Sequence, residues 1–254
     1  MTPGQWQAQA GWRRIDLLSD VHLHQDARRT FDAWRTHLLS TPADAVLILG
    51  DLFDVWIGDD VRTSGFERDC AAVLREASQA KALAFMHGNR DFLLGQAMCD
   101  DCGLQPLTDP TLAQAWGQRV LLTHGDALCL ADTDYQRFRL EVRAEDWQRN
   151  FLALPLAERR RRAKAMRDAS VQHQAGMRPE QWADVDEAAA MDWLEAAAAS
   201  VMVHGHTHRP AAHVLPDGRV RRVLGDWDFE VTPARAVAMC WTPAGLVPMD
   251  LGSM

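Results

Sequence analysis

Short apolar runs recur along the first half of the chain, and each is followed by polar residues, with a glycine among them in two of the three runs. Residues 15–18 (IDLL), 45–49 (AVLIL) and 82–86 (ALAFM) have the length and composition of β-strands. The second run is apolar throughout, which is typical of a strand buried on both faces. The pattern predicts the interior strands of a sheet.

Helices are predicted between and after these strands. Phe31, Trp34 and Leu38 are spaced i, i+3, i+7, as on one face of a helix. Residues 70–77 read as a second helix, and residues 184–199 as an alanine-rich third. Strands that alternate with helices indicate an α/β fold.

Further strands are predicted in the second half of the chain. Residues 120–123 and 201–203 are apolar runs, each followed by a histidine. Closing strands are predicted around Val220, Val223, 236–240 and 246–251.

The interval between Asp126 and Asp184, about 58 residues, is far longer than an ordinary connection in a compact domain. Its apolar residues are grouped: Tyr135, Phe138 and Val142 are helically spaced, and an aromatic and leucine cluster follows over residues 147–156. We therefore expect one domain, residues 1–254, with residues 133–177 inserted as a helical cap over the sheet edge. The alternative is an extension that packs only for stability.

Composition narrows the classes of protein. The 254 residues are 47% apolar, enough for one large α/β domain, and carry a formal net charge of −8, which argues against a nucleic-acid binder. The charge is segregated, because residues 137–167 hold ten Arg or Lys and four Asp or Glu, a net charge of +6. This basic segment indicates an anionic partner or, alternatively, a solvated arginine-rich helix face.

The N-terminal residues lack the basic start and apolar core of a secretory signal, and no window reaches the roughly 18 apolar residues of a spanning helix. We expect a cytoplasmic protein that at most contacts a membrane. The Cys99-x-x-Cys102 pair has no second pair or nearby histidine to complete a zinc site, so two reduced cysteines are expected.

Candidate metal ligands follow five of the predicted strands. In open α/β sheets ligands bind beyond the carboxyl ends of the strands, so these side chains should converge, and neighbouring glycines allow the sharp turns this requires. The groups are Asp20 and His22 after the first strand, Asp51 after the second, Asn89 after the third, His124 after the fourth, and His206 and His208 after the fifth.

Asp, His and Asn ligands without cysteine suit Mn²⁺, Fe²⁺ or Zn²⁺. Seven ligands are too many for one ion, whereas two ions about 3.5–4 Å apart that share a carboxylate would use them all. Such a pair clamps a phosphoryl group and activates water for attack on it.

The order D-x-H, G-D-x-x-D, G-N-x-D, H-G-D, G-H-x-H, over residues 20–208, resembles the calcineurin-like metallophosphoesterase family. The resemblance implies a four-layer sandwich of two mixed β-sheets flanked by helices. It also implies two divalent metal ions, with Mn²⁺ favoured, and Asp51 as the bridge. The first ion would be held by Asp20, His22, Asp51 and His208, and the second by Asp51, Asn89, His124 and His206.

Arg90 departs from the family's usual G-N-H-[DE] spelling, in which the histidine is taken to protonate the leaving oxygen. A guanidinium cannot act as a general acid at neutral pH, so the leaving group should need no proton. A phosphate monoester released from an anhydride meets this condition, because its second pKa is about 6. Arg90 therefore indicates pyrophosphate cleavage, unless it packs against an acid such as Asp91.

The wider spellings SDVHLHQD, LGDLFDVWIGDD, MHGNRDFLLG, VHGHTHRPAAH and LGDWD resemble the UDP-2,3-diacylglucosamine hydrolases of lipid A biosynthesis over nearly the whole chain. The resemblance implies cleavage of UDP-2,3-diacylglucosamine to 2,3-diacylglucosamine 1-phosphate (lipid X) and UMP. It implies that the cap holds the acyl chains and that the protein is peripheral on the cytoplasmic side of the inner membrane. It gives no indication of nucleic acid or of an obligate protein partner.

The same resemblance suggests which residues act on substrate. Catalytic roles fall to Asp51, Asn89, Arg90, His124 and His206, and substrate binding to Asn89, Arg90, Asp132, Ser170, Gln174, Arg178 and His206. Gln174 stands where the family has asparagine. The family's lysine position falls on Met177 without a gap or on Arg178 with one inserted residue, and Arg178 keeps the cation.

Two rival functions remain open on the sequence alone. The first is a metallophosphoesterase that acts on another phosphodiester or on phosphoproteins, against which Arg90 and the cap argue. The second is a non-catalytic scaffold on the same fold, which would be expected to have lost metal ligands.

Overall fold

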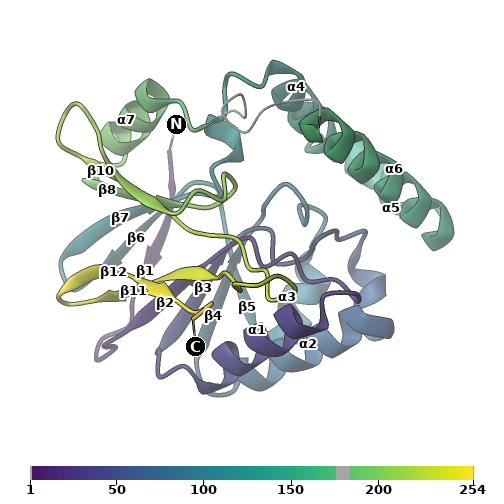
Figure 1. Ribbon diagram of the computed structural model, residues 1–254, viewed down its shortest axis with the longest axis horizontal. Helices are drawn as coiled ribbons and strands as arrows, with labels where there is room; N and C mark the ends of the chain where they lie inside the picture. The colour runs from purple at the N-terminus through teal and green to yellow at the C-terminus, as the bar shows by residue number, and fades with distance from the viewer. Residues whose placement is uncertain (1, 176–183, 254) are drawn as a thin grey trace.

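Two six-stranded β-sheets lie face to face, and helices cover their outer faces (Figure 1). The computed structural model describes residues 2–175 and 184–253. The first sheet has the order β1-β6-β7-β8-β10-β9 and the second β12-β11-β2-β3-β4-β5, and both contain parallel and antiparallel pairs. The strands are β1 (Gly4–Gln7), β2 (Ile15–Leu18), β3 (Ala45–Leu49), β4 (Ala82–Met86), β5 (Leu104–Leu107), β6 (Thr111–Ala115), β7 (Gln118–Leu122), β8 (Val201–His204), β9 (Ala211–Val214), β10 (Val220–Val223), β11 (Val237–Thr242) and β12 (Gly245–Asp250).

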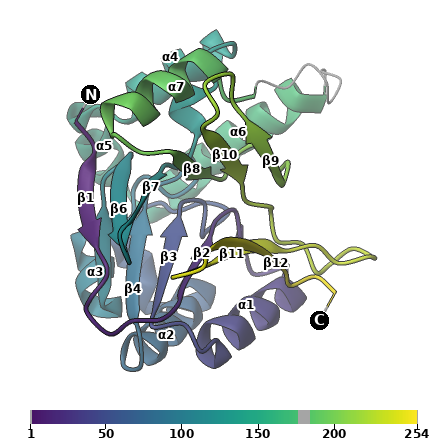
Figure 2. The same cartoon turned by 90° about the vertical axis from the view of Figure 1, so that its left-hand side faces the viewer.

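The helices form two outer layers and a separate group above the sheet edges. Helices α1 to α3 cover the second sheet and α7 covers the first, while α4 to α6 extend away from the sandwich (Figures 1 and 2). The α-helices are α1 (Arg28–Ser40), α2 (Gly65–Ser78), α3 (Gln96–Cys102), α4 (Thr133–Val142), α5 (Glu145–Leu152), α6 (Leu156–Ala175) and α7 (Glu187–Ala196), and two 3₁₀ turns are η1 (Asp59–Thr63) and η2 (Asp126–Leu128).

Three buried apolar clusters join these layers. One packs Trp34 and Leu74 of the helices against the second sheet, and another lies between the sheets, where Leu47 belongs to the same cluster as Val203. The third packs Leu194 of α7 on the first sheet. The expected four-layer order of helices, sheet, sheet and helix is thereby confirmed.

The continuous apolar run of β3 is explained by this arrangement. All five of its residues are buried, because alternate side chains enter the clusters on opposite faces of the sheet. Strands β2, β3 and β4 run parallel in register, so their carboxyl ends meet at one edge.

Ion pairs join α6, part of the predicted cap, to the sandwich. Arg159 of α6 is buried and donates to Asp60 Oδ1 at 2.8 Å and to the Ile57 carbonyl at 2.5 Å. Arg167 of the same helix pairs with Asp54. These contacts place α6 across from the loop that follows β3, and the treatment of residues 133–177 as a cap stays a prediction.

Candidate metal centre

The seven predicted ligands follow the carboxyl ends of strands from both sheets. Asp20 and His22 follow β2, Asp51 follows β3 and Asn89 follows β4 in the second sheet. In the first sheet, His124 follows β7, and His206 and His208 follow β8. The two sheets therefore present their ligands to one another across the open edge of the sandwich.

One group of donors surrounds a space beside β2. Asp20, His22 and His208 each offer an atom within 4.8 Å of the others. His208 Nε2 is 3.2 Å from Asp20 Oδ1 and 3.3 Å from His22 Nε2. Two imidazole nitrogens and a carboxylate oxygen thus point to the same place.

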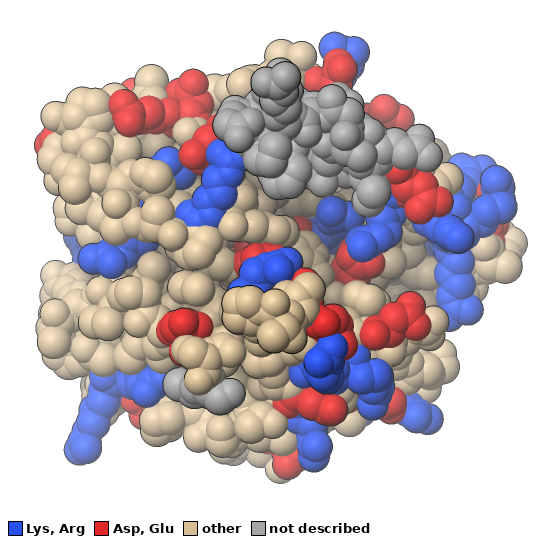
Figure 3. Space-filling model, in the orientation of Figure 1, with Lys and Arg blue, Asp and Glu red and all other residues tan. Residues whose placement is uncertain are grey.

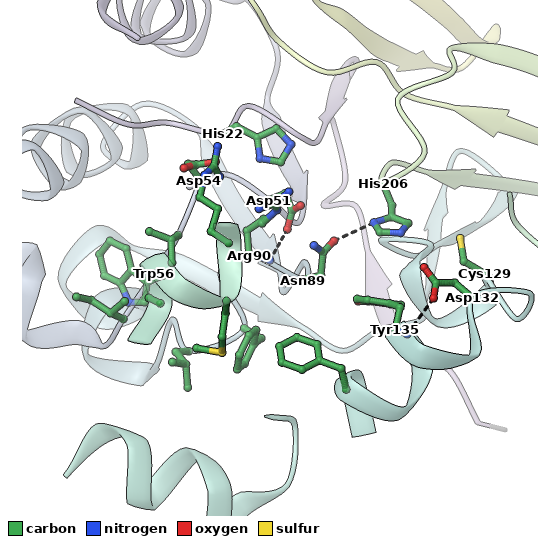
Figure 4. A pocket seen from close by; sticks show the side chains of 18 of the residues that line it. His22, Asp51, Asp54, Trp56, Asn89, Arg90, Cys129, Asp132, Tyr135 and His206 are labelled. Carbon is green, nitrogen blue, oxygen red and sulfur yellow. Dashed lines mark hydrogen bonds and ion pairs between the residues drawn. The ribbon is translucent and has the colours of Figure 1, made fainter. Parts of the chain in front are cut away.

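A second group lies next to it. Asn89 Oδ1 is 2.9 Å from His124 Nε2 and 2.8 Å from His206 Nδ1 (Figure 4 shows the latter contact). Asp51 Oδ1 is 3.7 Å from His124 Nε2, and Asp20, Asp51 and His124 all offer atoms within 4.8 Å of one another. Because Asp20 belongs to both groups, the two spaces adjoin, and the bridging role of Asp51 stays a prediction.

Five of the seven residues have left-handed backbone conformations, which non-glycine residues rarely adopt. Their φ angles lie between 51° and 66° at Asp20, His22, Asp51, His206 and His208. Such conformations cost of order 1–3 kcal/mol each and persist only where the surroundings enforce them. The turn after each strand is thus held so that its side chain points into the shared space.

Close backbone approach explains the glycines at this edge. A Cβ on Gly88 would lie 2.0 Å from Asp51 Oδ1, and one on Gly205 would lie 2.2 Å from Asp20 Oδ2. The buried carboxylate of Asp91 fixes the same region by accepting from the amides of Gly88 at 2.9 Å and Leu52 at 2.8 Å.

Burial and mutual charge shift the titration of the cluster. Burial raises the pKa of Asp51, and the nearby carboxylates of Asp91 and Asp20 raise it further. For Asp20, burial acts in the same direction, but the charge and hydrogen bond of His208, together with the charges of His124 and His22, outweigh it and hold the pKa well below its usual range. Burial would lower the pKa of His124, yet Asp51 and Asp20 raise it to about 9. Protons on the cluster offset the negative charge of its carboxylates, and bound cations could take over this role.

The donors suit a pair of divalent metal ions. Two adjoining groups of three or more oxygen and imidazole donors match the ligands that Mn²⁺, Fe²⁺ or Zn²⁺ take. His22 Nδ1 is buried without a hydrogen-bond partner, and two imidazole nitrogens approach to 3.3 Å in the first group. A cation between His22 Nε2 and His208 Nε2 would be coordinated by both of these ring nitrogens, which otherwise face one another.

The side chain of Arg90 does not pair with Asp91. Asp91 accepts from backbone amides, and the Arg90 Nε is buried without a hydrogen-bond partner. Among the described residues, no carboxylate forms an ion pair with Arg90, although its amide donates to Asp51 Oδ1 at 2.8 Å. The guanidinium lines the cavity beside the metal ligands, where it is available to an anion (Figure 4).

A cavity of about 610 Å³ runs from the ligand cluster to the cap. At one end are His22, Asp51, Asn89, His206 and His208, and at the other is an aromatic wall of Phe92, Phe138, Trp147 and Phe151. The Trp147 and Phe151 rings stack with their centroids 4.9 Å apart. The cavity thus joins a polar end, lined by the candidate metal ligands, to an apolar and aromatic end.

The predicted substrate residues outside the cluster are placed unevenly. Asp132 lines the cavity, and its Oδ1 accepts from the Tyr135 amide at 2.9 Å, which caps α4. Ser170 and Gln174 belong to α6, but their side chains lie outside the described part of the structure. Arg178 and Met177 lie outside the described residues, so their alternative stays a prediction.

Sequence reasoning missed three side chains, two on α4 and one at its C-cap residue Arg143, that contact the surroundings of the candidate ligands. Tyr135 donates to Asp126 Oδ2 at 2.6 Å and places its ring 5.8 Å from that of His206. Arg139 also donates to Asp126 Oδ2, at 2.8 Å, and Arg143 donates to the Gly88 carbonyl at 2.9 Å. Their i, i+4, i+8 spacing is a helical stripe, and this was the available signal.

The chain is similar to known proteins over most of its length. The Calcineurin-like phosphoesterase family matches residues 13–210. A UDP-2,3-diacylglucosamine hydrolase from Marinobacter nauticus is 40% identical, covering 85% of this chain and 90% of that protein. One from Cellvibrio japonicus is 43% identical, covering 84% and 91%. Vacuolar protein sorting 29 from Cryptosporidium parvum shares the fold at 13% identity, with a TM-score of 0.50 and coverage of 94% and 90%.

Proposed function

The chain belongs to the calcineurin-like phosphoesterase family, and from that premise we propose the reaction and the roles of its residues. The protein is a hydrolase that cleaves the pyrophosphate bond of UDP-2,3-diacylglucosamine to 2,3-diacylglucosamine 1-phosphate and UMP, as the names of its relatives indicate. The observation that carries this conclusion is that one continuous cavity joins the ligand cluster to an aromatic wall. A substrate with a diphosphate at one end and acyl chains at the other matches both ends.

The ligand cluster would hold two divalent ions, for which Mn²⁺ is our choice. Asp20, His22 and His208 would hold the first, while Asn89, His124 and His206 would hold the second, with Asp51 shared. When bound, the ions supply Lewis acidity to the phosphoryl oxygens and to the attacking water. The protein contributes the fixed positions of the ligands, which are held by strained turns and buried hydrogen bonds.

Arg90 would bind the diphosphate. Its guanidinium faces the cavity without a carboxylate among the described residues, and it can donate two parallel hydrogen bonds to phosphoryl oxygens. It cannot give up a proton at neutral pH, so it stabilises charge on the leaving phosphate without protonating it. We place the attack of water at the uridine-side phosphorus, so that 2,3-diacylglucosamine 1-phosphate leaves and UMP takes up the water oxygen.

The acyl chains would lie between the aromatic wall and α6. Met166 and Ala163 of α6 line this part of the cavity opposite Phe92 and Trp147. Apolar side chains of this kind gain free energy by covering methylene groups, at roughly 25 cal/mol per Å² of apolar surface removed from water.

The outer face of the cap would contact the cytoplasmic surface of the inner membrane. Leu140 of α4 is 73% exposed and Leu152 of α5 is also exposed, and Lys and Arg side chains gather where α5 ends and α6 begins (Figure 3). Exposed leucines beside cations suit an anionic lipid surface. Among the described residues, no helix is both long and apolar enough to cross a bilayer.

The rates on three substrates test this function. We expect the purified protein with Mn²⁺ to turn over UDP-2,3-diacylglucosamine far faster than a nitrophenyl phosphodiester or a phosphopeptide. Preference for either of the latter would favour another phosphoesterase activity. A protein that neither binds a divalent metal nor hydrolyses any of the three would support a non-catalytic scaffold.

A further inference from the structure

A row of hydrogen-bonded side chains, the half-exposed Asp184 and the buried Arg221 and His204, lies directly behind the candidate metal ligands that follow β8. Arg221 of β10 is nearly fully buried, and its Nη1 is 3.1 Å from Asp184 Oδ1 and 3.0 Å from His204 Nε2. His204 is itself fully buried, and its Nδ1 is 2.8 Å from the Gly205 carbonyl. None of these residues belongs to the predicted ligand set.

The chemistry of its partners determines the direction of each hydrogen bond of the His204 ring. A guanidinium only donates, so His204 Nε2 must accept from Arg221. A carbonyl only accepts, so His204 Nδ1 must carry the proton and donate to Gly205. The imidazole is held in one tautomer and one orientation by partners on both sides.

The Gly205 carbonyl is the start of the turn that carries two metal ligands. It also accepts from the Thr207 amide at 2.8 Å, while the His206 amide donates to both oxygens of Asp20 at 3.1 and 3.0 Å. Both ends of the peptide between Gly205 and His206 are therefore fixed. The turn needs such support, because His206 and His208 have φ angles of 66° and 54°.

His204 also contacts the neighbouring strand end. A Cβ on Gly125, the residue after His124, would lie 2.9 Å from His204 Nδ1. The imidazole is thus packed between the turns that follow β7 and β8, where movement of its ring would displace both.

We propose that His204, oriented by Arg221 and Asp184, is a positioning residue that holds the Gly205 carbonyl and so sets where His206 and His208 present their ring nitrogens to the metal ions. This inference rests on the proposed metal-dependent function. Outer hydrogen bonds of this kind typically change metal affinity 10- to 100-fold when they are lost.

Two substitutions of His204 by amide residues test its two hydrogen bonds separately. In His204→Asn the amide nitrogen occupies the place of Nδ1, so the donor to Gly205 is kept and the contact with Arg221 is lost. In His204→Gln the amide reaches toward the place of Nε2, so the contact with Arg221 is kept and the donor to Gly205 is lost. His213→Gln on the edge strand β9 is the matched control.

The readouts are Mn²⁺ stoichiometry and affinity by calorimetry, the electron paramagnetic resonance of the bound ions, and the Tm of the metal-free protein. We expect His204→Asn to bind two ions within about threefold of the parent affinity despite a lower Tm, because the buried Arg221 keeps Asp184 but loses its hydrogen bond to His204. His204→Gln should keep its Tm but lose tenfold or more in affinity for at least one ion. An affinity that follows Tm across the variants would overturn the proposal.

A second pair keeps the test decisive if His204→Asn fails to fold. Arg221→Lys retains a donor to His204 Nε2 and should bind Mn²⁺ like the parent, whereas Arg221→Met frees the ring to change tautomer and should bind about tenfold more weakly. Equal affinities for these two would also overturn the positioning role. A parent protein that binds no metal would refute the proposed function itself. If the parent binds two ions but the Mn²⁺ affinities of the variants do not follow the predicted order, only this inference is refuted.

Discussion

At the scale of single residues, the centre combines strained backbone with side chains that lack partners. The left-handed turns at Asp20, Asp51 and His206 cost free energy that a structure selected for stability alone would avoid. Arg90 adds a buried Nε without a hydrogen-bond partner. Both features are expected where a fold is arranged for a ligand that completes it.

Substitution of Arg90 tests whether it grips phosphate or donates a proton. Arg90→Lys keeps the charge but loses the bidentate geometry, so we expect a loss of about 1.5–3 kcal/mol in transition-state stabilisation. Arg90→His should weaken cleavage of UDP-2,3-diacylglucosamine while favouring an alkyl phosphodiester, whose leaving group needs a proton. The measurement is kcat/KM of each variant on both substrates, and an equal loss on both for Arg90→His would contradict the argument.

Asp51→Asn removes the charge of the proposed shared ligand. We expect the rate to fall by several orders of magnitude and the second Mn²⁺ to be lost in calorimetry, because an amide is a weaker ligand for both ions. Asp69→Asn on the exposed face of α2 is the control and should change neither quantity. Turnover near the parent rate with saturating Mn²⁺ would exclude the shared role.

At the scale of elements, α4 differs from the other cap helices. Tyr135 and Arg139 of this helix and its C-cap residue Arg143 form hydrogen bonds to Asp126 and Gly88 beside the candidate metal ligands. Helix α6 is joined instead to the loop after β3 and lines the apolar end of the cavity. We infer that α4 supports the proposed metal centre and contributes Phe138 to the apolar end of the cavity, which α5 and α6 also line.

Phe138 and Leu140 of α4 form a matched pair for testing the apolar end of the cavity. Phe138 lines the cavity, whereas Leu140 does not and is mostly exposed. We expect Phe138→Ser to raise KM for the lipid substrate roughly tenfold, about 1.4 kcal/mol, and to spare a lipid-free phosphodiester. Leu140→Ser should leave both KM values unchanged in detergent. If Phe138→Ser impairs both substrates equally, the cavity wall is structural and does not bind lipid.

The elements that the sequence predicts are those with a local pattern of apolar residues. The runs at β2, β3 and β4 match the predicted strands, whereas β1 (GQWQ) and β5 (LQPL) were not predicted. The latter two have little apolar character and are specified by pairing with β6 and β4, which depends on tertiary structure.

Helix α7 shows a similar limit. The expected helix over residues 184–199 is Glu187–Ala196, because Asp186 caps its start and Asp184 turns away to pair with Arg221. Likewise, the spacing of the candidate ligands along the chain indicates that they converge, but nothing local predicts the left-handed turns or the contact between His204 and Arg221. Those features exist only once strands from both sheets have been assembled.

At the scale of the whole molecule, the two sheets act together because neither carries a complete centre. Asp20, Asp51 and Asn89 come from one sheet, and His124 and His206 from the other. Metal binding should therefore stabilise the contact between the sheets as well as create the active centre.

The charge of the metal-free centre predicts how metal binding depends on pH. The raised pKa of His124, about 9, keeps its imidazole protonated at neutral pH, and a ligand must lose this proton before it can bind a cation. The affinity for Mn²⁺ should therefore rise with pH between about 6.5 and 8.5, by roughly tenfold per pH unit for each proton released. Calorimetry in buffers of different ionisation enthalpy measures the protons released, and an affinity independent of pH would contradict this prediction.

The most direct test of the central claim is the fate of the water oxygen. The protein would be incubated with UDP-2,3-diacylglucosamine and Mn²⁺ in ¹⁸O water, and both products would be analysed by mass spectrometry. We predict that UMP carries one ¹⁸O atom and that 2,3-diacylglucosamine 1-phosphate carries none, because water attacks the uridine-side phosphorus. Label in the lipid phosphate, or absence of cleavage by metal-loaded protein, would contradict this account.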